Sequence, residues 1–177
     1  MFRIIAIIVV VALIGVFALA AMKPDQFTVT RSITINAPAE KIFPLINDFH
    51  NWGAWSPFEK MDPAMKRTMS GAEMGQGAIY AWEGNDKAGS GRMEITHATP
   101  PNNVTIQLDF TKPFPANNVV DFTLSPNGNG DTTTVTWEME GRNGYFAKLM
   151  GVFFNMDSMV GGQFDSGLQA MKAAAEK

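Results

Sequence analysis

The sequence predicts an α+β domain in which a curved antiparallel sheet grips one long C-terminal helix. Two observations lead to this fold class. Residues 144–175 contain no proline and repeat large apolar residues in steps of three and four, which places them on one helical stripe. Before them, about seven short segments alternate apolar and polar residues between Gly, Pro and Asn turns, as antiparallel strands do. A helix of roughly 45 Å at 1.5 Å per residue needs a large apolar surface, which the sheet supplies.

The N-terminus carries an uninterrupted apolar run, Ile4 to Met22, between Arg3 and Lys23. As a helix it would span roughly 28 Å, close to the ~30 Å hydrocarbon thickness of a bilayer. One interpretation is a retained transmembrane helix. The other is a signal peptide, because residues 18–20 (ALA) match the small-x-small cleavage pattern. The run exceeds the ~7–15 residues of a signal core, which favours the anchor.

These features divide the chain into a membrane anchor or signal segment (1–22), a linker (23–26) and one folded domain (27–177). With the short N-terminus inside, the domain would lie on the extracytoplasmic, periplasmic side of a membrane. Cleavage of a signal peptide would instead leave a secreted protein.

The first strand is expected at Phe27–Ile35, with Phe27, Val29, Ile33 and Ile35 on one face. Arg31 falls on this apolar face, either with its head reaching solvent at an edge or as the partner of a buried carboxylate. A short helix interrupted by Pro44 and an aromatic loop follow. The remaining strands are expected at Met65–Met69, Gly77–Glu83, Ser90–Ala98, Val104–Phe110, Asn118–Leu124 and Thr132–Glu140.

Composition excludes several classes of function. The net charge is −3, and residues 23–177 hold 13 Lys and Arg against 17 Asp and Glu, which argues against a nucleic-acid partner. The absence of cysteine excludes disulfides, thiolate metal sites and Cys nucleophiles. Neither the two histidines nor any other motif forms a metal, nucleotide or hydrolase signature, so no metal or cofactor is expected.

Asp157 is the most informative single residue, because helical spacing places it near the middle of the apolar stripe, between Phe153 and Val160. Buried carboxylates are rare unless they are paired. One reading is a structural carboxylate bonded to the backbone or to a Tyr, Trp or Arg. The other is a polar anchor or acid/base group inside a cavity, with a pKa raised by desolvation.

Aromatic and methionine side chains share the inward phase of several predicted strands; most of them would pack in the core, and some would line a cavity between sheet and helix. Trp52 and Trp55 lie in a loop, where they would serve as a lid or as plain packing. His97 ends a strand on the apolar phase. The complete set of candidate ligand-binding residues is Trp52, Trp55, Tyr80, Trp82, Met93, His97, Phe110, Phe122, Trp137, Phe153 and Asp157.

Four stretches resemble the START-like, helix-grip superfamily (SRPBCC, polyketide cyclase/dehydrase-like). They are residues 32–43 (SITINAPAEKIF), 51–57 (NWGAWSP), 75–84 (GQGAIYAWEG) and 89–93 (GSGRM). The likeness covers about residues 27–175. Its members include lipid binders, metabolite binders, cyclases and hydroxylase domains, so the resemblance implies the fold rather than one function. The His ligands and Rieske cysteines of the oxygenase branch are missing, and no cyclase catalytic motif transfers.

The resemblance therefore implies a domain that binds a hydrophobic small molecule or lipid near a membrane. One alternative is a cyclase- or hydrolase-type enzyme that uses Asp157 with Tyr80 or His97. Another is a protein-interaction module whose cavity is filled by its own side chains.

Overall fold

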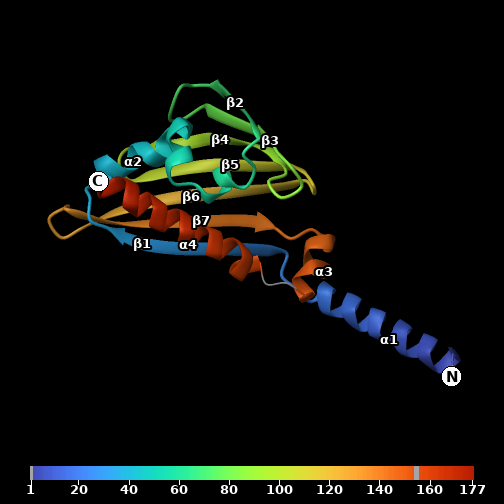
Figure 1. Cartoon of the computed structure of the whole chain (residues 1–177). Coiled ribbons are helices and arrows are strands. Elements are labelled where there is room, and N and C mark those ends of the chain that lie inside the picture. The colour runs from blue at the N-terminus through green and yellow to red at the C-terminus, as the bar shows by residue number, and fades with distance from the viewer. Residues whose placement is uncertain (1, 154–155) are drawn as a thin grey trace.

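The computed structural model describes residues 2–153 and 156–177 and contains one seven-stranded antiparallel sheet. The strands are β1 (Gln26–Ile35), β2 (Lys66–Gly71), β3 (Ala78–Glu83), β4 (Ser90–Thr99), β5 (Asn103–Lys112), β6 (Ala116–Asn127) and β7 (Thr132–Arg142), in the sheet order β1-β7-β6-β5-β4-β3-β2. The helices are α1 (Phe2–Ala21), α2 (Ala39–Asn47), α3 (Tyr145–Phe153) and α4 (Met156–Ala175), with short 3₁₀ helices η1 (Phe49–Ala54) and η2 (Pro57–Lys60). The sheet curves around α4, and α1 projects from one end (Figure 1).

The alternation along the strands produces this sheet. On β6 and β7 every second side chain is buried, and Phe122 pairs with Trp137 across the two strands. The short turn between them contains two glycines with positive φ, Gly128 at 56° and Gly130 at 92°, a backbone conformation that glycine adopts without steric cost. The predicted α+β fold with a curved antiparallel sheet and a C-terminal helix is confirmed.

The C-terminal helix is not one continuous rod, and the prediction was wrong on this point. Residues 145–153 form α3, which packs against α1, and α4 begins only at Met156. The ring of Tyr145 stacks on Phe17 of α1 with centroids 6.5 Å apart. An apolar stripe does not specify which surface covers it, and α1 offers a second apolar surface besides the sheet.

The helix that covers the sheet is α4. Its buried face consists of Phe164, Leu168, Met171 and Ala175, spaced by four, three and four residues, with Val160 partly buried one turn before them. This face lies over β1 and over the segment from α2 to η2.

The first turns of α4 are held by Arg31, which reaches inward from the edge strand β1. Its guanidinium donates to both carboxylate oxygens of Asp157, at 2.9 and 3.0 Å, and to Asp165 at 3.3 Å. Gly161 leaves room for this head, because a methyl group on its Cα would lie 2.0 Å from Arg31 Nη2. Arg31 thus has carboxylate partners, but those carboxylates are exposed rather than buried.

The predicted burial of Asp157 was wrong, although its carboxylate does pair with an arginine, as one of the two readings expected. Its side chain is 56% exposed, because it stands in the first turn of α4, beside an edge strand and above the guanidinium of Arg31. The hydrogen bond from Arg31 lowers the pKa of the Asp157 carboxyl below its ordinary value of 3.8, the opposite of the shift expected for a carboxyl inside a cavity.

The placement of His97 was also wrong. The pairing of β4 with β5 shifts register between Ile95 and His97. One irregularity reverses the phase of every residue beyond it. His97 is therefore exposed, and its Nε2 lies 2.9 Å from the hydroxyl of Thr99.

One end of the space between sheet and helices is filled by α2 and η1. The indole N–H of Trp52 donates to the carbonyl of Ile46 at 3.0 Å, and that of Trp55 donates to the carbonyl of Leu45 at 2.7 Å. Both indoles are at least 96% buried. These bonds fix the aromatic segment to α2, so Trp55 is part of the packed core rather than a lid.

Candidate ligand-binding cavity

The other end of the same space is hollow. A cavity of about 330 Å³ lies between the sheet, η2 and α4, within the usual ~300–1,000 Å³ of ligand sites. Much of its wall comes from β5, the N-terminal part of β6, β7 and the first half of α4, and η2, β3, β4 and the adjoining loops contribute the rest, with single residues of β1 and η1. In β5, β6, β7 and α4 the lining residues are Ile106, Leu108, Phe110, Ala116, Asn118, Val120, Trp137, Met139, Val160 and Phe164.

Six of the candidate residues line this cavity: Trp52, Tyr80, Trp82, Met93, Phe110 and Trp137. Each except Trp52 stands on a strand in the inward phase. Trp55 and Phe122 are fully buried behind the wall, where the ring of Phe122 lies 4.9 Å from that of Trp137. His97 and Asp157 lie outside the cavity, and the side chain of Phe153 is outside the described residues.

Aromatic rings form much of the wall around Trp137. Its ring stacks on Phe164 of α4, with centroids 3.9 Å apart and planes 9° from parallel. Trp55 and Phe58 meet the same indole edge-on at 5.5 and 6.3 Å. The stack joins sheet to helix where the filled end meets the hollow end.

Another part of the wall contains a polar cluster built on Glu59. This carboxylate accepts from the hydroxyl of Tyr80 at 2.5 Å and from Arg67 Nε at 2.7 Å. Burial first, and the bond to Glu59 second, raise the pKa of Tyr80 above its ordinary 10.0. Tyr80 is therefore a neutral donor whose proton is already engaged, and the charge of Glu59 is compensated by Arg67.

Two polar atoms of the lining residues have no such partner. Oγ of Ser56 and Nε1 of Trp137 are buried and make no hydrogen bond. Ser56 is 1% exposed and Trp137 is 3% exposed. Most buried polar groups in proteins are paired, so these two atoms are exceptions; both are enclosed by neighbouring atoms and do not face the open volume of the cavity.

Sequence reasoning missed several lining residues. Ile106 and Leu108 share the strand phase of Phe110, and Val120 shares that of Phe122, so alternation was a usable signal for them. Ser56, Phe58, Glu59, Met61 and Phe114 lie in short helices or loops, where no period exists to predict a direction.

The catalytic set considered from sequence does not assemble. Asp157 pairs with Arg31 outside the cavity, His97 lies on the outer surface of β4, and Tyr80 lies inside and bonds to Glu59. The ligand-binding hypothesis consequently rests on the cavity itself and not on Asp157.

Comparisons with known proteins agree with this architecture. The family model described as "Polyketide cyclase / dehydrase and lipid transport" matches residues 26–176. The search of curated protein sequences found no match.

Several solved structures share the fold. Norcoclaurine synthase from Thalictrum flavum, solved with dopamine and hydroxybenzaldehyde, is 10% identical with a TM-score of 0.63, and the match covers 84% of this chain and 86% of that one. A Thermobifida fusca protein is 20% identical with a TM-score of 0.62, covering 84% of this chain and 92% of that one. A Chromobacterium violaceum protein is 13% identical with a TM-score of 0.60, covering 88% and 99%. These identities show the fold alone, whereas the family model covers nearly the whole domain, and the chain therefore belongs to the polyketide cyclase/dehydrase and lipid transport family.

Proposed function

We propose that this protein binds a hydrophobic small molecule or a lipid in the cavity between the sheet and α4, beside a membrane in which α1 is anchored. The observation that carries the proposal is the unfilled apolar volume. An apolar molecule that fills this volume removes the apolar side chains of the wall from water, which contributes about 25 cal/mol per Å² of apolar surface buried.

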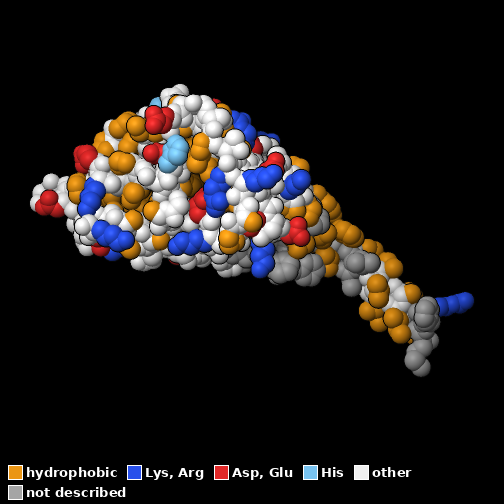
Figure 2. All heavy atoms as spheres, turned by 45° about the horizontal axis from the view of Figure 1, so that its top comes forward, with side chains coloured by type: hydrophobic (Ala, Val, Ile, Leu, Met, Phe, Trp, Pro, Cys, Tyr) orange, Lys and Arg blue, Asp and Glu red, His pale blue; other side chains and the backbone are white. Residues whose placement is uncertain are grey.

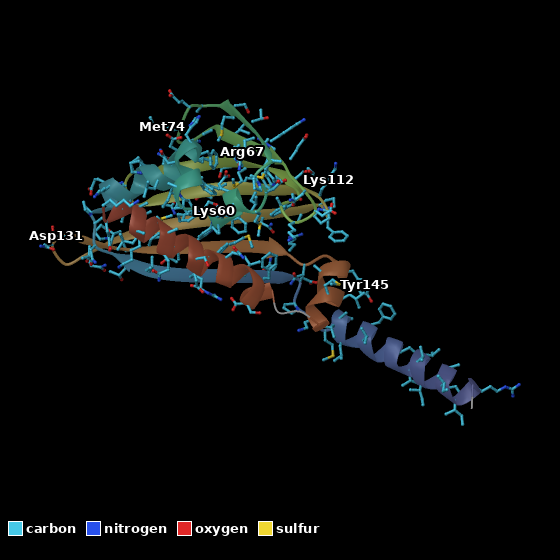
Figure 3. All side chains as sticks on the ribbon, in the orientation of Figure 1. Lys60, Arg67, Met74, Lys112, Asp131 and Tyr145 are labelled. Atoms are coloured by element: carbon cyan, nitrogen blue, oxygen red, sulfur yellow. The ribbon has the colours of Figure 1, made fainter. Side chains whose placement is uncertain are left out.

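The position of the cavity supports the membrane part of the proposal. Its lining residues Phe27 and Phe114 lie at the start of β1 and in the β5–β6 loop. Figure 3 places Lys112, at the end of β5, and Tyr145 at the end of the domain from which α1 emerges, and Asp131 at the opposite end. Phe114 is 59% exposed, so an aromatic side chain of the cavity wall projects at the α1 end.

The chemistry of α1 fits an anchor. Residues Arg3–Ala21 form a helix with a mean hydropathy of 3.2, long and apolar enough to cross a membrane. Hydrophobic side chains cover the projecting helix in Figure 2, whereas the visible face of the domain carries many charged side chains. The start of α3 is tied to the segment after α1, because Lys148 pairs with Asp25 and the Asn143 amide N–H donates to the Asp25 carbonyl at 2.9 Å. With the N-terminus in the cytoplasm, the domain and its cavity face the periplasmic side.

The test compares three forms of the full chain purified in nanodiscs: wild type, Val120→Phe and Val119→Phe. Val120 lines the cavity and is 4% exposed, whereas Val119 is 39% exposed and points to the other face of β6. We expect solvent extraction and mass spectrometry to find a stoichiometric apolar molecule with wild type and Val119→Phe, and to find it depleted with Val120→Phe. Equal recovery from all three forms would refute the cavity as the site.

A further inference from the structure

We infer that α3 is a second membrane-binding element, whose apolar surface lies against lipid at the level where α1 leaves the bilayer. This inference rests on the membrane part of the proposed function, because it needs α1 to cross the membrane. It adds a surface that α1 alone does not require, and it names the partner of that surface as the apolar boundary of a lipid bilayer.

The sequence of α3 is almost wholly apolar. Its nine residues, 145–153 (YFAKLMGVF), contain one charged side chain, that of Lys148. This charge is compensated, because Nζ of Lys148 pairs with the carboxylate of Asp25 in the linker after α1, and the lysine side chain is only 13% exposed. The helix therefore presents no uncompensated charge, which would be costly to place against lipid.

The folded domain does not cover this apolar surface. Among the described side chains of α3 none is buried: those of Tyr145 and Met150 are 56% and 39% exposed. Leu149 and Val152 are half-buried. Isolated helices shorter than about 12–15 residues are marginal in water, so a helix of this length needs a further surface for its apolar side chains.

The main packing partner of α3 within the described chain is α1, the proposed membrane span. Figure 3 shows Tyr145 beside α1, where its ring stacks on that of Phe17 with centroids 6.5 Å apart. Phe17 lies about one turn before Ala21, the last residue of α1, or about 6 Å along the axis at 1.5 Å per residue. Where α1 spans the hydrocarbon, the ring of Tyr145 thus lies at the membrane boundary, the depth at which tyrosine is enriched.

Basic residues lie where the domain would meet the lipid headgroups. Lys23 follows α1 and Arg142 ends β7 just before α3, and both are exposed. Figure 3 places Lys112 at the same end of the domain. Lysine and arginine next to an apolar segment extend their charged heads to the interface. An apolar helix with basic residues beside it fits a bilayer, whose hydrocarbon lies next to phosphate groups.

This placement would hold the cavity at the membrane surface. Two of its lining residues, Phe27 and Phe114, lie at the end of the sheet from which α3 continues. A single spanning helix leaves the domain free to reorient above the bilayer, whereas a second contact fixes the end that faces lipid. An apolar ligand would then pass between bilayer and cavity with a short path through water.

The experiment measures the depth of single nitroxide labels on the full chain in nanodiscs, which is possible because the chain has no native cysteine. Met150→Cys on α3 is the test, and Val119→Cys on β6 is the matched control, since both native side chains are 39% exposed. Val11→Cys reports whether α1 crosses the bilayer. In saturation EPR we expect oxygen, which dissolves in lipid, to relax the labels at 150 and 11 more than a water-soluble nickel chelate does. The order should reverse at 119.

A second measurement needs no substitution. In the wild-type chain with ¹³C-methyl methionine, a lipid that carries a nitroxide in its upper acyl chain should broaden the signal of Met150. The signal of Met74 should keep its width, because Met74 is 59% exposed at the end of the domain away from α1 (Figure 3).

The three labels separate failure of this inference from failure of the proposed function. If the label at 11 lies in lipid while the nickel chelate dominates at 150, α3 lies in water and the inference is wrong, but the anchor α1 stands. If the nickel chelate dominates at both, the membrane part of the proposed function falls as well. Mutual broadening of labels at 150 in discs that hold two chains, without contact with oxygen, would show that a second copy covers α3 and would also overturn the inference.

Discussion

Replacing Phe164 by alanine tests how the cavity is closed by α4. Phe164 is 2% exposed, lines the cavity and stacks on Trp137 with centroids 3.9 Å apart. Phe→Ala changes in cores cost about 3–5 kcal/mol, and the cost rises with the void that remains. The new void would join a cavity that the sheet already holds open, so collapse is limited, and the stack is also lost. We expect a loss of about 4–5 kcal/mol in the free energy of unfolding.

The assay is urea unfolding of the full chain in nanodiscs, followed by tryptophan fluorescence. All four tryptophans are buried in the folded domain, so unfolding should shift their emission to longer wavelength. For a chain of this size the loss corresponds to a decrease in Tm of roughly 8–20 °C. Phe164→Leu keeps an apolar side chain over the ring and should cost only about 1–2 kcal/mol. A loss below about 2 kcal/mol for Phe164→Ala, with the denaturant slope unchanged, would refute the view that this stack joins α4 to the sheet.

Three further predictions concern the ion pair of Arg31 with Asp157, Tyr80 in the cavity wall, and the proposed anchor α1. Arg31→Gln should speed amide exchange in the first turns of α4 at pH 7. Because Arg31 lowers the pKa of Asp157, the stabilisation from their ion pair is fully present above the ordinary pKa of 3.8 and is lost as pH falls through the lowered value. A difference in exchange rate between wild type and Arg31→Gln that persists in acid would contradict this reasoning. Tyr145→Phe leaves Tyr80 as the one tyrosine. The pKa of Tyr80 in the folded domain is raised above 10.0, so phenolate absorbance should not rise near pH 10 while the domain is folded. The neutral Tyr80 therefore contributes to the free energy of unfolding fully below pH 10, and this contribution is lost at higher pH. Val11→Arg places a charge near the middle of α1 at a cost of about 2.5–3.5 kcal/mol and should move the protein out of the membrane fraction, whereas Val11→Leu should not; equal fractionation would exclude α1 as the anchor.

The sheet was predictable because alternation is a local signal. The inward phase on β3, β5 and β7 places Tyr80, Trp82, Phe110 and Trp137 in the cavity wall. The phase does not tell a cavity wall from a packed core, as Phe122 shows: it shares the phase of Val120 but lies in the filled end. That distinction depends on where α2 and η1 pack, which is a long-range property.

The wrong predictions also depend on structure that local spacing does not encode. His97 lies on the opposite face from the predicted one because a single irregularity in β4 reverses the alternation, and no residue type at that position predicts the irregularity. Asp157 fits the stripe of α4 by spacing, but it lies in the first turn of α4, and the spacing of apolar residues alone does not locate where that helix begins. Ser56 and Glu59, two of the polar residues of the wall, lie just before and within the short helix η2, where no strand period exists from which to predict their direction.

Titration of methionine methyl groups with 2-undecanone tests the binding site most directly. Met93 and Met139 line the cavity, Met171 is fully buried without lining it, and Met69 is 37% exposed on β2. With ¹³C-methyl methionine in the full chain, we predict saturable shifts of the Met93 and Met139 signals, with those of Met171 and Met69 unchanged. Shifts confined to Met69 or Met171, or no saturable shift at all, would contradict a ligand site between the sheet and α4.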